Sequence, residues 1–212
     1  MFIYIHITCI NHYQSLFEKM MKKIMDSGLY EKVTKIYISL IGVPDGLEWL
    51  QDKKLEILYK GSMGHYEDET INRMDVPDDV PVLYLHSKGV TKPHIKQIND
   101  WTELMLYYLI DEWRLCLEGL KEYDTVGVNL HTKPIPKYQG NCVHYSGNMW
   151  WTTGRHLKNI GKLAMISYLD SEMHVCKKGL HLSLWNSNIN HYYEYYPPEK
   201  YRGIVEPYCV KH

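Results

Sequence analysis

The chain has 212 residues, of which 45% are hydrophobic and 23% charged, and its formal net charge is -1. This composition is ordinary for a globular protein with a substantial core. Basic residues form no stripe and no apolar run reaches the length of a bilayer span, so we expect neither nucleic acid binding nor a membrane span. The five cysteines are scattered and form no CxxC pair, which predicts reduced thiols and a cytoplasmic location.

Strand and helix patterns alternate through the first 130 residues. An alternating apolar run opens the chain, and helical stripes separate the later apolar runs from one another. We expect strands over residues 2–8, 33–41, 55–59 and 80–85, and helices over 12–27, 66–74 and 97–120. This alternation implies right-handed βαβ units, and therefore an α/β protein with a central, mostly parallel sheet flanked by helices.

The pattern is less regular after residue 131. We expect strands over 125–130 and 142–152, helices over 155–160 and 170–179, and no regular element in the polar, aromatic tail after Trp185. The chain contains no internal repeat and no low-complexity linker, which favours a single domain over residues 1–212.

The apolar strand at 80–85 ends in the turn His86-Ser87-Lys88-Gly89. Ligands of open α/β sheets bind at the carboxyl ends of strands, so these side chains are the first candidates for a site. Lys88 would neutralise a diphosphate, His86 would ligate a divalent cation or bind a phosphate oxygen, and Gly89 would let the backbone approach the ligand. The alternative is an ordinary polar turn after a buried strand.

A second candidate site is an aromatic segment in which Ser146, Gly147 and Asn148 precede Trp150 and Trp151. A sugar ring presents C–H faces that fit tryptophan and hydroxyls that fit an amide, so the segment is typical of carbohydrate contact. The alternative is a buried strand with a bulge at Gly147 and core tryptophans.

Carboxylates supply the remaining candidates. Asp170 and Glu172 precede an expected helix, where either would serve as a general base toward an acceptor hydroxyl. The alternative is a helix cap for Asp170 and a favourable dipole contact for Glu172. The acidic stretch 66–70 either lines a nucleotide pocket or starts a helix, and Asp78 and Asp79 either attract a cation or form a solvated turn.

Several well-known motifs are absent. The chain has no GxGxxG after its first strand, no GxxxxGK[ST], no GxSxG and no HExxH. These absences argue against a Rossmann dinucleotide site, a P-loop, an α/β-hydrolase nucleophile and a zinc protease.

Four segments together resemble GT-A-type glycosyltransferases of the group found in bacterial glycan loci and large DNA viruses. They are 84–89 (Tyr-Leu-His-Ser-Lys-Gly), 99–101 (Asn-Asp-Trp), 126–129 (Val-Gly-Val-Asn) and 144–151 (His-Tyr-Ser-Gly-Asn-Met-Trp-Trp). The likeness covers nearly the whole chain. It is greatest to the glycosyltransferase domain that chlorella viruses use on capsid glycans, which would place this protein in the host cytoplasm.

The resemblance implies a nucleotide sugar donor, most often UDP-linked, together with Mn²⁺ or Mg²⁺. The base and ribose would lie near Thr8 and Ser39, and the diphosphate would lie near residues 86–89. Residues 1–130 would then form the nucleotide-sugar half of the domain. The transferred sugar would be a hexose or deoxyhexose, similar to glucose or rhamnose.

The resemblance also implies that a glycan acceptor approaches residues 146–151 in an acceptor half formed by residues 131–212. Asp170 or Glu172 matches the position of the catalytic carboxylate in inverting members. Transfer would therefore invert the configuration at the anomeric carbon.

One feature departs from the family pattern. GT-A enzymes usually carry an Asp-x-Asp motif after the fourth strand, where this chain has His86-Ser87-Lys88. The residues that the sequence offers for a metal are therefore His86, Asp78 and Asp79, unless Lys88 replaces part of the metal's charge.

Two other functions fit parts of the sequence. A sugar nucleotidyltransferase has a similar sheet, but residues 8–12 lack the glycine-rich loop that it needs. A carbohydrate-binding or degenerate non-catalytic module would explain both the aromatic residues and the missing Asp-x-Asp motif.

Overall fold

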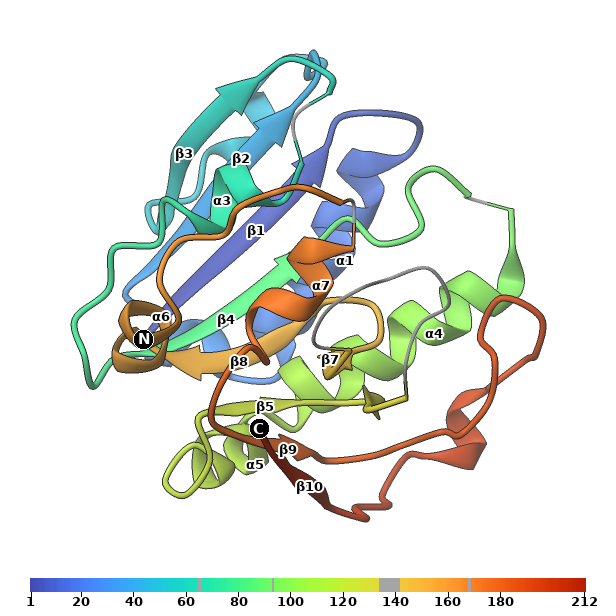
Figure 1. Cartoon of the computed structure of the whole chain (residues 1–212). Coiled ribbons are helices and arrows are strands. Elements are labelled where there is room, and N and C mark those ends of the chain that lie inside the picture. The colour runs from blue at the N-terminus through green and yellow to red at the C-terminus, as the bar shows by residue number, and fades with distance from the viewer. Residues whose placement is uncertain (65, 93, 134–141, 168) are drawn as a thin grey trace.

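The computed structural model describes residues 1–64, 66–92, 94–133, 142–167 and 169–212, and its centre is an eight-stranded, mostly parallel sheet (Figure 1). The strands, in the order in which they lie side by side, are β10 (Tyr208–Lys211), β9 (Leu180–Ser183), β5 (Thr125–Gly127), β8 (Trp150–Thr153), β4 (Pro81–His86), β1 (Phe2–Thr8), β2 (Lys35–Ile41) and β3 (Leu55–Gly61). A separate two-stranded sheet pairs β6 (Leu130–His131) with β7 (His144–Tyr145). The predicted α/β class and mostly parallel sheet are therefore confirmed.

Helices cover both faces of the sheet. They are α1 (Tyr13–Asp26), α2 (Leu29–Lys32), α3 (Asp68–Ile71), α4 (Lys96–Leu106), α5 (Trp113–Gly119), α6 (Gly154–Ile160) and α7 (Asp170–His174), with short turns η1 (Glu48–Leu50), η2 (Tyr107–Asp111) and η3 (Pro198–Lys200). Along β1, Ile3 and Ile5 enter a core with α1 and α4, whereas Tyr4 enters a second core with Ile71 of α3. The alternation follows from the two-residue repeat of a strand. Among the described helices, none combines the length and apolarity needed to cross a bilayer.

The first four strands create a crevice at one edge of the sheet. They run parallel in the order β4-β1-β2-β3, so the chain moves outward from β1 to β3 and then returns to the other side of β1. In α/β sheets the ligand site forms where the strand order reverses in this way, beyond the carboxyl ends of the strands. Here that position lies between the ends of β1 and β4.

The second half of the chain extends the same sheet. β8 lies antiparallel between β4 and β5. The single strand expected over 142–152 is instead β7 followed by β8, because the chain turns at Gly147 and Asn148, whose φ angles are 95° and 49°. Glycine and asparagine adopt this left-handed conformation at the lowest cost. The turn matters because it places residues 147 and 148 at the end of β4.

The C-terminal segment contains strands that the sequence pattern does not predict. α7 ends at His174 rather than near residue 179, β9 runs parallel to β5, and β10 runs antiparallel to β9. β9 lacks the expected alternation of apolar and polar residues because the polar residue His181 is fully buried. Its Nδ1 lies 2.8 Å from the Thr125 hydroxyl. A polar residue at an inward position hides the alternation that identifies a strand.

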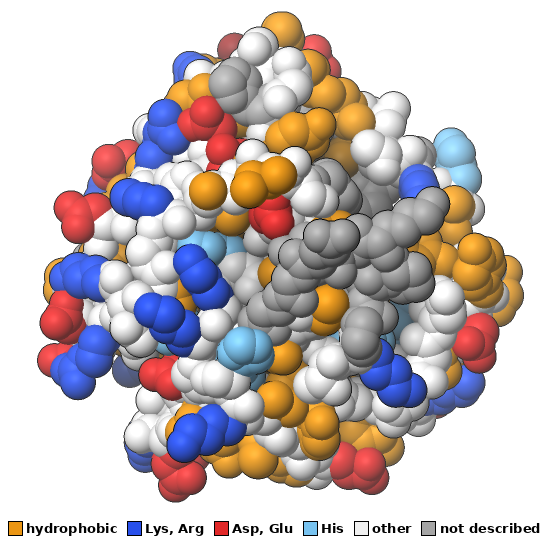
Figure 2. Space-filling model, viewed as in Figure 1, with side chains coloured by type: hydrophobic (Ala, Val, Ile, Leu, Met, Phe, Trp, Pro, Cys, Tyr) orange, Lys and Arg blue, Asp and Glu red, His pale blue; other side chains and the backbone are white. Residues whose placement is uncertain are grey.

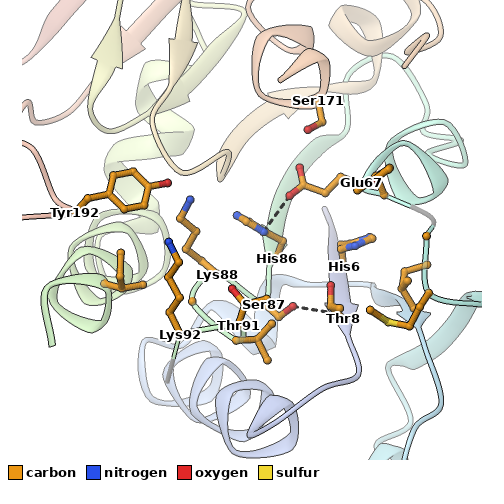
Figure 3. A pocket seen from close by; sticks show the side chains of 17 residues that line it. His6, Thr8, Glu67, His86, Ser87, Lys88, Thr91, Lys92, Ser171 and Tyr192 are labelled. Carbon is orange, nitrogen blue, oxygen red and sulfur yellow. Dashed lines mark hydrogen bonds and ion pairs between the residues drawn. The ribbon is translucent and has the colours of Figure 1, made fainter. Parts of the chain in front are cut away.

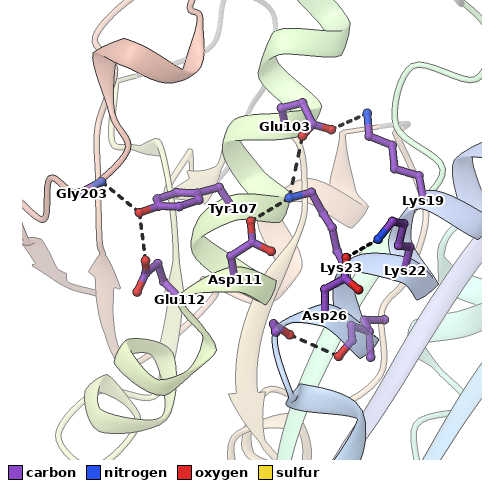
Figure 4. Close-up of polar contacts among 11 residues, drawn as sticks. Lys19, Lys22, Lys23, Asp26, Glu103, Tyr107, Asp111, Glu112 and Gly203 are labelled. Carbon is purple, nitrogen blue, oxygen red and sulfur yellow. Dashed lines mark hydrogen bonds and ion pairs between the residues drawn. The ribbon is translucent and has the colours of Figure 1, made fainter.

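An ion-pair network joins α1 to the long helical segment that contains α4 and η2 (Figure 4). Lys23 Nζ lies 2.7 Å from an Asp111 oxygen and 3.9 Å from a Glu103 oxygen, and Lys19 pairs with the other Glu103 oxygen. The single helix expected over 97–120 is instead divided into α4 and α5 by the π-helical turn η2. The network holds α4, which carries Trp101, in place beneath the crevice.

Candidate functional site

A pocket of about 580 Å³ opens at the carboxyl ends of β1 and β4 (Figure 3). β1 contributes His6 and Thr8, and β4 with its following turn contributes His86 and the segment 87–92. Ser171 and Tyr192 are the contributions from the second half of the chain. The pocket therefore occupies the position that the strand order predicts for a ligand site.

The two ends of the pocket differ in character. One end is apolar, and it is formed by Ile41, the last residue of β2, and by Met63, which lies shortly after β3. Met63 Sδ packs closely over Gly42. Tyr192 lies at the opposite end, where its ring packs edge-on against Trp101 of α4 with ring centroids 5.5 Å apart. Lys88 and Lys92 lie next to Tyr192 (Figure 3).

The turn after β4 is fixed by short-range bonds. The Ser87 hydroxyl accepts the Thr8 backbone N–H at 2.9 Å, and the Ser87 backbone N–H donates to the His6 carbonyl at 2.9 Å, so the ends of β1 and β4 are joined. Gly89 has a φ of 84°, and a Cβ there would lie 2.8 Å from Ile98 Cγ2. This position therefore requires glycine, because a side chain would be strained and would collide with α4.

Two lysines give the pocket its positive charge. Lys88 Nζ lies 4.1 Å from the centre of the Trp101 ring, and Lys92 Nζ lies 5.0 Å from the centre of the Tyr192 ring. Burial lowers the pKa of Lys88, while the charges of Glu172 and Glu67 oppose that shift. In the part of the chain that the structure describes, neither ammonium forms an ion pair. Two such cations in one pocket fit an anion such as a phosphate ester.

Glu67 organises a polar network at the pocket floor. One of its carboxylate oxygens lies 3.1 Å from His86 Nδ1, and the other accepts the Asn148 side-chain N–H. His86 Nε2 donates to the Gly147 carbonyl at 2.6 Å, and Trp150 Nε1 donates to Asn148 Oδ1 at 3.0 Å. Both the nitrogen and the oxygen of the Asn148 side-chain amide, and both ring nitrogens of His86, are thus engaged.

The protonation of His86 follows from these contacts. The Gly147 carbonyl can only accept, so Nε2 carries a proton, and Nδ1 faces the Glu67 carboxylate at 3.1 Å. Burial and then the Lys88 ammonium lower the pKa of His86 to about 4. Burial and His86 likewise lower the pKa of His6, to about 4, and His6 Nδ1 lies 2.9 Å from the Thr70 hydroxyl. The pocket floor is therefore uncharged at His6.

The structure brings five of the predicted donor-binding residues together. Thr8, His86, Ser87, Lys88 and Gly89 all line the pocket. Ser39 was expected with them, but it does not line the pocket. It is fully buried within β2 beside His6, and its hydroxyl has no hydrogen-bond partner in the described chain.

The two candidate catalytic carboxylates differ in position. Asp170 accepts the backbone N–H groups of Ile166 and Ser167 at 2.7 and 2.5 Å, so it holds the loop before α7. Glu172 does not line the pocket, but it follows Ser171, which does. Burial and then the charge of Glu172 raise the pKa of Tyr192, and the same charge opposes the lowering of the pKa of Lys88 by burial. Because the Asp170 carboxylate is engaged with its own loop, Glu172 is the better candidate for a group that acts on a ligand.

The expectation that Trp150 and Trp151 cover a sugar requires correction. Both side chains are 0% exposed. Trp150 packs on Tyr84 with ring centroids 4.8 Å apart, and Trp151 Nε1 donates to the Leu109 carbonyl at 2.9 Å. Neither ring presents a face to a ligand, so both are core residues. Their large apolar area explains why the fold buries them.

The rest of that segment contributes through its backbone and its amide. Gly147 and Asn148 are tied to His86 and Glu67, as described above. Ser146 does not line the pocket, and its backbone N–H donates to the Asn129 carbonyl at 3.0 Å. The segment therefore shapes the pocket floor from behind.

The candidate metal ligands do not come together. Asp78 and Asp79 precede β4 and lie at the opposite end of that strand from His86. Asp78 pairs with Lys158 at 2.5 Å, and Asp79 pairs with Arg155. Both nitrogens of His86 are already engaged, and no three His, Cys, Asp or Glu residues are grouped for a metal anywhere in the described ranges. The donor groups described here therefore do not fit the expected Mn²⁺ or Mg²⁺.

Some site residues were missed or underrated in the sequence. Glu67 was noted only as part of the acidic stretch 66–70, and Lys92 and Tyr192 were not singled out. Lys92 lies four residues after Lys88, and this spacing is a signal that both lysines serve one site. The residues around Tyr192 carry no comparable signal that Tyr192 lies beside the turn after β4. A comparison with protein-family models and with curated proteins finds no match, so the site must be interpreted from its own geometry.

Proposed function

We propose that the protein is a glycosyltransferase of the GT-A type, which transfers a hexose or deoxyhexose from a UDP-sugar to a hydroxyl of a glycan. The observation that carries the proposal is the pair Lys88 and Lys92, without ion-pair partners among the described residues, in a pocket at the strand-order reversal between β1 and β4. The sequence resemblance supports it independently.

The shape of the pocket suggests how the donor would lie. The apolar end near Ile41 and Met63 suits the flat base, and the Thr8 side of the pocket suits the ribose. The diphosphate would lie against Lys88 and Lys92, because ammonium groups form charge-assisted hydrogen bonds with phosphate oxygens. The sugar would then extend toward Tyr192 and Ser171.

The reaction needs a base and a stabilised leaving group. The acceptor oxygen attacks C1 of the donor sugar while the bond from C1 to the diphosphate oxygen breaks, and that oxygen keeps the electron pair. Glu172 takes the proton from the acceptor hydroxyl. Lys88 and Lys92 stabilise the negative charge that develops on UDP. Electrostatic stabilisation of the transition state is usually the largest single contribution to catalysis. Attack from the face opposite to UDP inverts the anomeric carbon.

The lysines also give a reason for the missing Asp-x-Asp motif. A divalent cation in a GT-A site supplies positive charge next to the diphosphate. In the proposed site the two ammonium groups supply that charge, and the donor groups of the described residues do not fit a metal. We therefore expect UDP binding to persist in EDTA.

A thermal-shift experiment tests the proposal. UDP, GDP and CMP are compared in Mn²⁺ and in EDTA, for the wild-type protein and for Lys88→Met and Lys92→Met. Lys121→Met is the matched control, because Lys121 is exposed, pairs with Glu118 and precedes β5 at the other end of the sheet. Loss of one charged hydrogen bond should raise the Kd for UDP about tenfold or more in each pocket variant.

Two outcomes would refute the proposal. If no nucleotide stabilises the wild-type protein but a free glycan does, the chain is a carbohydrate-binding module. If UDP stabilises the wild type and both lysine variants equally, the site lies elsewhere. Release of UDP from UDP-glucose or UDP-rhamnose in the presence of a glycan acceptor then measures transfer itself.

A further inference from the structure

Exposed tyrosines gather on one turn beside the pocket. The turn comprises residues 190–196, after β9, and is called here the aromatic turn. Tyr192, Tyr193 and Tyr195 expose 50%, 78% and 53% of their surfaces. Figure 2 shows hydrophobic side chains, tyrosine included, at the right-hand edge, where Figure 1 draws this segment in red-orange. Exposed aromatic residues in a cluster indicate a binding surface more strongly than scattered ones do.

The aromatic turn is held in shape by its own hydrogen bonds. The backbone N–H groups of Tyr193 and Glu194 donate to the Asn190 carbonyl at 2.9 and 3.0 Å. The Tyr192 N–H donates to Asn190 Oδ1 at 3.0 Å, and the Asn190 N–H donates to the Glu194 carboxylate at 3.0 Å. A turn fixed in this way loses little conformational freedom when a ligand binds.

His191 anchors the aromatic turn to the pocket. Its side chain is 5% exposed and stacks on Trp101 with ring centroids 5.3 Å apart. His191 Nε2 also lies 2.8 Å from the Ser187 hydroxyl. Trp101 is the ring over which Lys88 lies, so the aromatic turn and the cationic part of the pocket share one support.

Lysines of the segment after β4 fix two of the tyrosine rings. Lys92 Nζ lies 5.0 Å from the centre of the Tyr192 ring, and Lys96 Nζ lies 5.2 Å from the centre of the Tyr195 ring. The hydroxyl of Tyr192 points toward the ammonium groups of Lys88 and Lys92 (Figure 3). Tyr192 is therefore the boundary between the pocket and the exposed part of the aromatic turn.

We propose that the aromatic turn binds a pyranose ring of the acceptor glycan. Flat aromatic faces bury the C–H face of a sugar, and the phenol hydroxyl groups bind its hydroxyls. This inference rests on the proposed function, and it moves the acceptor site from the buried Trp150 and Trp151 to the exposed tyrosines.

The position of Glu172 favours the acceptor over the nucleobase as the occupant. An acceptor must bring its hydroxyl to the base, and Glu172 follows Ser171, which lines the same pocket as Tyr192 and Lys88. The base of the donor would instead occupy the apolar end near Ile41 and Met63, across the lysines from Tyr192. The aromatic turn thus lies on the side of the pocket where the sugar leaves the donor.

The test compares sugar binding with UDP binding. The variants are Tyr193→Ala, Tyr195→Ala and their double variant. Tyr208→Ala is the control, because Tyr208 is 44% exposed on β10, the outermost strand on the far side of β5 and β9. The probes are methyl β-D-glucopyranoside and methyl α-L-rhamnopyranoside, and their binding is measured by saturation-transfer NMR with UDP present. Calorimetry gives the Kd for UDP separately.

We expect at least one glycoside to bind the wild type through its ring protons. The double variant should bind it about three- to tenfold more weakly, the size expected for loss of aromatic contact. The Kd for UDP should change by less than about twofold, and Tyr208→Ala should match the wild type. Weaker glycoside binding in the double variant supports the inference even if UDP does not bind, although the proposed function would then fail.

Two results would overturn the inference while leaving the proposed function intact. One is that UDP binds and the double variant takes up the glycoside as well as the wild type does. The other is that UDP binds but neither glycoside shows saturation transfer to the wild type.

Discussion

Glu67 is the residue whose removal tests the pocket floor most sharply. Its side chain is 15% exposed and joins His86 at the end of β4 to Asn148 in the turn between β7 and β8. Glu67→Ala would leave the buried Asn148 N–H without its acceptor and His86 Nδ1 without its partner. Each unsatisfied buried polar group costs about 1–3 kcal/mol, so we expect the free energy of unfolding to fall by roughly 2–4 kcal/mol.

Glu67→Gln is the matched control. The amide has the shape of the carboxylate, and its oxygen can still accept the Asn148 N–H. Its N–H can donate to Nδ1 of a neutral His86, the form favoured by a pKa of about 4. We therefore expect this variant to stay within about 1 kcal/mol of the wild type.

Urea unfolding at pH 7.5, followed by tryptophan fluorescence, measures both variants. The prediction concerns their difference, because a general effect of lost charge would appear in both. The reasoning is refuted if Glu67→Ala unfolds at the wild-type urea concentration, or if Glu67→Gln is destabilised as much as Glu67→Ala.

Further predictions separate catalytic, structural and ionisation roles. Glu172→Gln should lower kcat for transfer about 10²- to 10⁴-fold with little change in the Kd for UDP. Asp170→Ala should keep most of its activity, and its free energy of unfolding should fall by about 1–2 kcal/mol. Equal activity of the two variants would contradict this assignment. Trp151→Phe should lower the free energy of unfolding by about 2–3 kcal/mol without changing the acceptor KM, because it removes the hydrogen bond to the Leu109 carbonyl and leaves a cavity in the core. A raised KM would show that the ring contacts sugar. His6 and His86 have pKa values lowered from 6.5 to about 4, so the unfolded chain binds more protons below pH 6.5. The free energy of unfolding should therefore fall as the pH drops from 6.5 to 4, by roughly 1 kcal/mol or more for each histidine by pH 5.5, and unchanged urea midpoints at pH 7.5 and 5.5 would contradict the assignment.

The sequence predicts the first half of the fold well because its signals are local. β1 occupies residues 2–8 as expected, and the strand expected over 80–85 is β4 shifted by one residue. Long apolar runs with glycine-containing turns identify buried parallel strands without reference to the rest of the chain. The carboxyl ends of such strands meet at one edge, and Thr8 and Lys88 both line the pocket there.

The remaining features depend on contacts between distant segments. Trp150 and Tyr192 are equally aromatic in the sequence, yet one is fully buried against Tyr84 and the other lines the pocket at half exposure. Only the packing of β8 against β4, and of residues 190–196 against α4, separates them. Glu67 is similar, because nothing in the acidic stretch 66–70 indicates which of its carboxylates will meet His86.

The most direct test of the proposed site is calorimetric titration in EDTA with UDP and with uridine, which differ by the diphosphate. If Lys88 and Lys92 hold that group, the wild type should bind UDP at least about tenfold more tightly than uridine, and the Lys88→Met Lys92→Met double variant should lose most of the difference. UDP binding that requires Mn²⁺ and is unchanged in the double variant would contradict the account.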